Sequence, residues 1–277
     1  MAKVPPLCLC SKILSKSDLL GVITKAHEIG YRGVELFGID RHLPPRTPIP
    51  AVRACGNLAK QLGVGIVVLD TYVGEFEAKA DAECEAQIDL FKRYLEMAVV
   101  LDCALIRVNP KYLGHDRAAT EEEMRRFAEW TRRCADLAEP LGKDVVLENN
   151  LSMIATVAGT LRVLEAVGRK NVGLNYDPGN IYRVDDGYGE AAVAAFGDRI
   201  RNVQVKQCNR EGDRIDLLME EGQVDYRKVF LALKAHGYRG YLSAECHRPA
   251  DATMNEEAIA RHEFEKIRAL RDEVWAS

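Results

Sequence analysis

Residues 144–177, DVVLENNLSMIATVAGTLRVLEAVGRKNVGLNYD, contain the repeating unit that decides the fold. The stretch begins and ends with short apolar runs rich in Val and Leu, at 144–149 and 172–177. A segment of helical period, which starts near Thr156, lies between the two runs. Short buried strands that alternate with crossover helices are typical of a parallel sheet. We therefore predict a strand, a helix and a second, parallel strand over this stretch.

The same unit recurs along the whole chain. Eight short apolar runs are interpreted as strands: PLCLC (6–10), GVELFG (33–38), VGIVVLD (64–70), ALIRVN (104–109), DVVLEN (144–149), VGLNYD (172–177), NVQVKQC (202–208) and GYLSAEC (240–246). The predicted helices start near Ser17, Ile49, Ala82, Thr120, Thr156, Gly189, Asp225 and Asn255. No Gly-x-Gly-x-x-Gly follows the first strand, so the alternation favours a closed barrel over an open, doubly wound sheet. The predicted fold class is α/β, a (β/α)8 TIM barrel that forms a single domain over residues 1–277.

The composition disfavours several classes of protein. Hydrophobic residues make up 47% and charged residues 29% of the 277 residues, which is an ordinary globular balance. The net charge of -4 disfavours a nucleic-acid partner, because surfaces that bind nucleic acid are basic. No apolar run reaches the ~18 residues of a membrane span, and the first residues lack the pattern of a signal peptide. We therefore expect a cytoplasmic protein without a membrane partner.

The eight cysteines include no C-x-x-C pair that would indicate a zinc ribbon or a redox motif. Cys8 and Cys10 share one face of the first predicted strand and could in principle bind a soft metal. Two thiols alone do not complete a tetrahedral site. We interpret the cysteines as buried core residues.

Acidic residues end three of the predicted strands. Glu148, Asp177 and Glu245 close the fifth, sixth and eighth runs. Barrel enzymes build their sites at these strand ends, so the three carboxylates are expected to converge there. Like charges raise one another's pKa unless a cation lies between them, which indicates a bound divalent metal. The alternative is that each acid is a separate capping or salt-bridged residue.

The motifs that carry these acids resemble those of the xylose isomerase-like barrels. The matching stretches are VVLEN (145–149), NVGLNYDPGN (171–180), IRNVQVK (200–206) and GYLSAE (240–245), and the likeness covers essentially the whole chain. This superfamily of sugar phosphate isomerases and epimerases includes ketose 3-epimerases, inosose dehydratases and 3-dehydroshikimate dehydratases. The resemblance implies four metal ligands: Glu148, Asp177, Gln204 and Glu245. Oxygen ligands suit Mn, Mg or Co, with zinc less favoured because no His or Cys completes the set.

Two positions depart from the pattern of the family. Gln204 stands where most relatives have a histidine ligand, a substitution that resembles the 3-dehydroshikimate dehydratase-like members. Asn180 stands where many relatives have a histidine that touches the substrate. The histidine-rich trinuclear zinc site of the endonuclease IV relatives, which share the barrel, is disfavoured because the six histidines are scattered and the chain is acidic.

The resemblance implies an isomerase or epimerase that moves a proton through a metal-stabilised enediolate, with Glu148 and Glu245 as acid and base. The alternative is a dehydratase of the inosose or 3-dehydroshikimate type that uses the same site, and a lesser alternative is a non-catalytic barrel that binds a sugar. No Gly-rich loop follows the last two predicted strands, so we expect an unphosphorylated, polyhydroxylated small molecule as substrate. A homo-oligomer is also expected.

Further polar residues lie at the predicted strand ends. Lys206 shares a strand face with Gln204 and is a catalytic candidate, with a structural ion pair to Asp177 or Glu245 as the alternative. We expect His247 to face the other way along the strand from Glu245 unless the chain has turned there. For Arg107 the alternative is an inter-strand salt bridge, and for Arg210 and His115 it is a solvated loop position. The candidates for substrate binding are Arg107, Asn109, Asn150, Asn180, Arg210 and His115.

Overall fold

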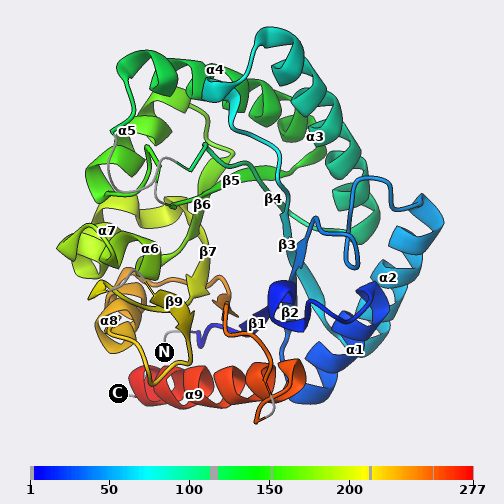
Figure 1. The fold of residues 1–277 in the computed structure, drawn as a ribbon, viewed down its shortest axis with the longest axis vertical. Coiled ribbons are helices and arrows are strands. Elements are labelled where there is room, and N and C mark those ends of the chain that lie inside the picture. Colours follow the sequence, from blue (N-terminus) through cyan, green and yellow to red (C-terminus); the bar gives the residue numbers. More distant parts are fainter. Residues whose placement is uncertain (1–2, 113–117, 151, 212–213, 252, 277) are drawn as a thin grey trace.

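The computed structural model describes residues 3–112, 118–150, 152–211, 214–251 and 253–276. Eight parallel strands close into a barrel in the order β1-β10-β7-β6-β5-β4-β3-β2, which confirms the predicted fold class (Figure 1). The strands of the barrel are β1 (Leu7–Cys10), β2 (Gly33–Phe37), β3 (Gly65–Asp70), β4 (Leu105–Arg107), β5 (Asp144–Glu148), β6 (Val172–Tyr176), β7 (Ile200–Val205) and β10 (Leu242–Ala244). Each strand lies within one of the eight predicted runs or extends it by two residues.

Helices surround the barrel on its outer side (Figure 1). Those that follow the barrel strands are α1 (Leu19–Ile29), α2 (Ile49–Leu62), α3 (Asp81–Leu101), α4 (Glu121–Ala138), α5 (Val157–Val167), α7 (Glu190–Phe196), α8 (Tyr226–His236) and α9 (Glu256–Ala276). The sequence sets their limits: Thr120 and Thr156 accept backbone hydrogen bonds as N-caps, and Gly63 ends α2 with φ +67°, a conformation that favours glycine. The predicted starts are correct to within two residues.

Strand side chains alternate between the helices and the barrel interior. In β5, Val145 and Leu147 pack into the large core that includes the helices, whereas Val146 belongs to a separate apolar cluster with Cys8, Val67, Val68 and Leu105. Because side chains two residues apart share a strand face, the next inward positions hold Cys10, Asp70, Arg107 and Glu148. A small apolar layer therefore fills the barrel below a layer that is mostly polar and charged.

Two features depart from the simple repeat. The seventh predicted strand, 202–208, is split: β7 ends at Val205, and β8 (Gln207–Asn209) pairs antiparallel with β9 (Arg214–Leu217) outside the barrel. In addition, the segment that follows β6 begins with a short extra helix, α6 (Pro178–Tyr182). Across the described parts of the chain, no helix is both long and apolar enough to cross a membrane.

Candidate active site

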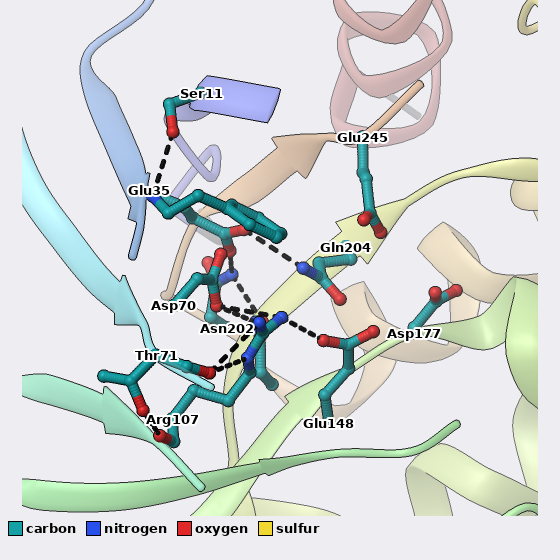
Figure 2. A network of polar contacts seen from close by, with 12 residues as sticks. Ser11, Glu35, Asp70, Thr71, Arg107, Glu148, Asp177, Asn202, Gln204 and Glu245 are labelled. Carbon is teal, nitrogen blue, oxygen red and sulfur yellow. Dashed lines mark hydrogen bonds and ion pairs between the residues drawn. The ribbon is translucent and has the colours of Figure 1, made fainter. Parts of the chain in front are cut away.

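Three carboxylates meet at the C-terminal mouth of the barrel (Figure 2). Glu148 is the last residue of β5, while Asp177 and Glu245 directly follow β6 and β10. Each offers an oxygen, and these atoms all lie within 4.8 Å of one another. The three residues are at most 8% exposed, so water screens their charges weakly. The convergence expected of these strand ends is present.

Backbone contacts hold the carboxylates in place. The Asn149 side chain donates to the Asp177 carbonyl at 2.6 Å and accepts from the Asp177 N–H at 2.9 Å, which ties the ends of β5 and β6 together. Asp177 Oδ1 also accepts from the backbone N–H of Asn180 at 3.2 Å and thereby caps α6. The Glu245 N–H donates to the Val205 carbonyl at 3.0 Å. The acids are therefore fixed by the fold and not carried on free loops.

Gln204 lies on β7 between the strands that position Asp177 and Glu245. Its Nε2 donates to Glu35 Oε2 at 3.1 Å. Its Oε1 is fully buried and has no hydrogen-bond partner among the described residues. A buried acceptor without a partner is unfavourable by about 1–3 kcal/mol and calls for a ligand. The donor set of three carboxylates and this carbonyl oxygen fits a hard divalent cation.

Two buried cations accompany these acids. Lys206 Nζ lies 2.6 Å from Asp177 Oδ2 and 3.3 Å from Glu245 Oε2. Arg107 forms a short ion pair with Glu148 and lies 3.4 Å from Asp70 Oδ1. Both cations therefore form ion pairs of the kind stated as the structural alternative to a role in catalysis or substrate binding. These ion pairs also keep both cations next to the carboxylates. Figure 2 shows Arg107 between Asp70 and Glu148.

The buried cations affect the pKa values of the acids to different extents. The pKa of Asp177 is raised from 3.8 to about 7, chiefly by burial. Lys206 lowers this pKa, whereas the negative charges of Glu245 and Glu148 raise it further. Burial acts in the same direction on Glu245, but Lys206 and His247 outweigh it and hold the pKa of Glu245 well below its ordinary value. At neutral pH without a metal, Glu245 is therefore ionised and Asp177 is partly protonated.

A second acidic group lies deeper in the barrel. Cys10, Glu35 and Asp70 offer atoms within 4.8 Å of one another, and all three residues are fully buried. Burial and the charge of Asp70 raise the pKa of Glu35 well above its ordinary value, and burial raises the pKa of Asp70 to about 6. The raised pKa values favour a proton on one of these two neighbouring carboxyl groups.

The charge balance of the barrel interior supports a cation at the mouth. Among the described residues, the buried charged groups inside the barrel are Glu35, Asp70, Glu148, Asp177, Glu245, Arg107 and Lys206. If all were ionised, five carboxylates would face two cations, with a surplus of three negative charges. A proton on one carboxyl group of the pair Glu35 and Asp70, whose pKa values are both raised, removes one of these charges, and a divalent ion would remove the other two. Buried charges without such compensation strongly destabilise a fold.

The remaining candidates are placed less centrally. Asn180 is 4% exposed and adjoins Asp177, and the buried Oδ1 of Asn150 has no hydrogen-bond partner in the described ranges. The main chain of Asn109 bonds to Val73 and Glu75. Arg210 is bound by Asp186 Oδ1 at 2.6 Å and by the Tyr182 carbonyl at 2.6 Å. His115 lies outside the described residues.

Sequence reasoning missed three residues beside the predicted ligands. His247 Nε2 lies 3.0 Å from Glu245 Oε1. Strand β10 ends at Ala244, before both residues, so the stated exception to the expectation that His247 faces away applies. His247 is two residues beyond Glu245, and this spacing could have placed both on one side. Glu35 is the single acid in the run GVELF, and Asp70 ends the third run. A carboxylate inside an apolar strand is itself a signal, because its burial is unfavourable without a partner.

A sequence model of the xylose isomerase-like TIM barrels matches residues 23–270. An inosose dehydratase from Bacillus licheniformis is 27% identical over 149 residues, which are 48% of this chain and 49% of the relative. The chain thus matches about half the length of that relative. A putative hydroxypyruvate isomerase from Mus musculus is 25% identical over 256 residues, 86% of this chain and 87% of the relative.

Solved structures show the same architecture. The crystal structure of the IolI protein, determined with a bound zinc atom, has a TM-score of 0.84 and 18% sequence identity. The superposition covers 98% of this chain and 100% of that protein. At this identity the likeness bears on the fold alone.

Proposed function

We propose that this chain, which belongs to the family of xylose isomerase-like TIM barrels, is a divalent-metal-dependent isomerase or epimerase. Its substrate would be a small, unphosphorylated sugar or another polyhydroxylated carbonyl compound. The observation that carries the proposal is the group of Glu148, Asp177 and Glu245 around the unpartnered Gln204 carbonyl oxygen. Family members include isomerases, epimerases and dehydratases, so the family alone leaves the reaction open.

Glu148, Asp177, Gln204 and Glu245 would hold the ion, which we propose to be Mn, Mg or Co. Their all-oxygen donor set favours these ions over zinc. When bound, the ion supplies positive charge that stabilises negative charge on the carbonyl and hydroxyl oxygens of the substrate. Asn149 and the cap of α6 fix Asp177 before any ion arrives, so little reorganisation is needed.

Glu148 and Glu245 would move the proton. They are held on β5 and directly after β10, strands that β6 and β7 separate in the barrel wall. One carboxylate can take the proton from the carbon next to the carbonyl while the other returns a proton on the opposite face. Arg107 would hold Glu148 in position through their ion pair, and Lys206 would place a further positive charge near the developing negative charge. Asn150 and Asn180 would contribute hydrogen bonds to substrate hydroxyls.

A dehydratase is the second candidate, and His247 is the observation that favours it. Its imidazole lies 3.0 Å from Glu245 Oε1 and is half-buried at the same mouth. Elimination requires a group that gives a proton to the departing hydroxyl, which then leaves as water. A histidine next to the base is suited to this role, because an imidazole ring can both accept and donate a proton.

Metal content and turnover together test the proposal. The wild type, Glu148→Gln, Asp177→Asn and the exposed control Glu165→Gln would be purified, and their metal measured by mass spectrometry. The same proteins would be assayed on ketoses, inososes, hydroxypyruvate and dehydroshikimate. We expect one divalent ion per chain in the wild type and the control, and its loss in the two site variants.

The mass of the product then separates the reactions. A product of unchanged mass identifies an isomerase or epimerase, whereas the loss of one water identifies a dehydratase. A wild type that is free of metal and inert on every compound would refute the catalytic reading and leave a barrel that only binds its ligand.

A further inference from the structure

Gln204 has two chemically different ends, and only one of them can bind a cation. Its carbonyl oxygen is an acceptor and a ligand for hard metals, whereas its amide nitrogen carries two protons and cannot coordinate. Rotation of the amide by 180° exchanges the two ends at little intrinsic cost. A glutamine ligand therefore works only if a neighbouring group decides which end faces the ion.

In the structure, Glu35 is the group that fixes the orientation of the Gln204 amide. Gln204 Nε2 donates to Glu35 Oε2 at 3.1 Å, and both residues are fully buried, so water does not compete. The opposite orientation would press the carbonyl oxygen of Gln204 against an oxygen of Glu35. Figure 2 shows the amide spanning from Glu35 toward the side of Glu148 and Asp177. The oxygen that points there is the one without a hydrogen-bond partner in the described chain.

Glu35 is itself held from its other side. Asn202 Nδ2 makes a short hydrogen bond to Glu35 Oε1 and also donates to Asn175 Oδ1 at 2.8 Å. Each oxygen of Glu35 thus receives one amide donor. The contact with Gln204 also crosses the barrel interior, because β2 and β7 are separated in the wall by β1 and β10. The orientation of Gln204 is therefore set by the opposite half of the barrel.

We propose that Glu35 is a positioning residue that directs the carbonyl oxygen of Gln204 into the metal site. The inference rests on the proposed function, since it takes Gln204 as a ligand. It also gives a reason why glutamine serves at this position. An imidazole offers a nitrogen at either edge of its ring, so a histidine needs less help in choosing its orientation, whereas an amide needs a fixed acceptor behind it.

A double-mutant cycle on metal affinity tests the coupling. Mn²⁺ titrations of the metal-free protein would compare the wild type, Glu35→Met, Gln204→His and the double variant. Methionine has a similar length and accepts no strong hydrogen bond. We expect Glu35→Met to weaken Mn²⁺ binding by about 10-fold to 100-fold in the Gln204 protein, and by less than about 3-fold in the Gln204→His protein. Cys10→Ala, which removes volume beside Glu35 but no acceptor of Gln204, serves as the matched control and should bind Mn²⁺ as the wild type does.

Equal losses in both backgrounds would show that Glu35→Met acts only through general damage to the core, and would overturn the inference. No loss in the Gln204 protein would overturn it as well. A wild type that binds no Mn²⁺ would refute the proposed function itself, and with it the metal role of Glu35.

A second measurement needs no folded variant of Glu35. In the metal-free wild type, NMR should show two separate, slowly exchanging Nε2 proton signals of Gln204, assigned by their absence from Gln204→His. Rapid exchange of these protons with water would contradict the orienting contact, whatever the metal affinity.

Discussion

Asp177→Asn provides a test of the charge crowding at the barrel mouth without any knowledge of the substrate. The pKa of Asp177 is raised from 3.8 to about 7, chiefly by burial. A folded-state pKa above the unfolded value means that the native state is favoured at low pH. This contribution is fully present below about pH 4 and is lost as the pH rises to about 7. Asparagine cannot ionise, so the variant lacks this dependence.

The size of the effect follows from the shift. Each pKa unit corresponds to about 1.4 kcal/mol, so the full shift corresponds to a ceiling of about 4 kcal/mol. The measured difference should be smaller, because the protein and water relax around an ionised Asp177. In the variant, Lys206 keeps Glu245 at 3.3 Å as its remaining partner. In the absence of metal, we expect Asp177→Asn to match the wild type near pH 4 and to be more stable at pH 8.

Urea denaturation in the presence of a chelator, at pH 4, 5, 6, 7 and 8, measures both free energies of unfolding. Addition of Mn²⁺ at 100 times its dissociation constant should then stabilise the wild type by about 2.7 kcal/mol and leave the variant unchanged. The reasoning would be refuted if Asp177→Asn were less stable than the wild type by about 3–5 kcal/mol at pH 8. That result is expected if the ion pair of Asp177 with Lys206 outweighs the crowding of carboxylates.

Three further predictions concern Asp177, Arg107 and the buried Glu263 of α9. Calorimetric titration should show Mn²⁺ affinity rising up to about 10-fold per pH unit below pH 7 and levelling off above it, because Asp177 must lose its proton before it binds metal; a flat profile would contradict this. Burial raises the pKa of Glu263 to about 7, so Glu263→Gln should become more stable than the wild type as the pH rises from 5 to 8, by up to about 3 kcal/mol. Urea denaturation measures this difference, and a difference that does not change with pH would contradict the prediction. Arg107→Met should lower the metal-free free energy of unfolding by about 3–5 kcal/mol, since Asp70 and Glu148 lose their common cation, and an unchanged urea midpoint would count against that pairing.

The fold could be predicted because its signals are local and repeated. Each barrel strand is a short apolar run, and each following helix has its own period and caps, as Thr120 and Thr156 show. The C-terminal end of the seventh strand was predicted too late because NVQVKQC was taken as one run, whereas β7 ends at Val205. The hairpin with β9 that takes up Gln207–Asn209 depends on pairing with a distant segment, which no local pattern reveals.

The site was predictable only where strand order places its residues. Glu148, Asp177 and Glu245 end strands that lie close together in a barrel, so their convergence follows from the fold. Glu35 was missed because it sits one pleat below the mouth, inside a run that otherwise indicates a core strand. Its partners, Gln204 and Asn202, come from the opposite half of the barrel, and only the closed structure brings them within hydrogen-bonding distance.

The distribution of polar residues in the barrel interior indicates that stability has been given up for function. Five buried carboxylates face two buried cations, and the pKa values of Glu35, Asp70 and Asp177 are all raised, which means that the fold disfavours their charged forms. A barrel filled with apolar side chains would avoid this penalty. The penalty is concentrated at the strand ends, above an apolar layer formed by Cys8, Val68, Leu105 and Val146. An electrostatic penalty of this kind persists where a bound ligand relieves it. The divalent ion that the crowded carboxylates would bind is also the ion that restores the charge balance, so its binding would stabilise the fold.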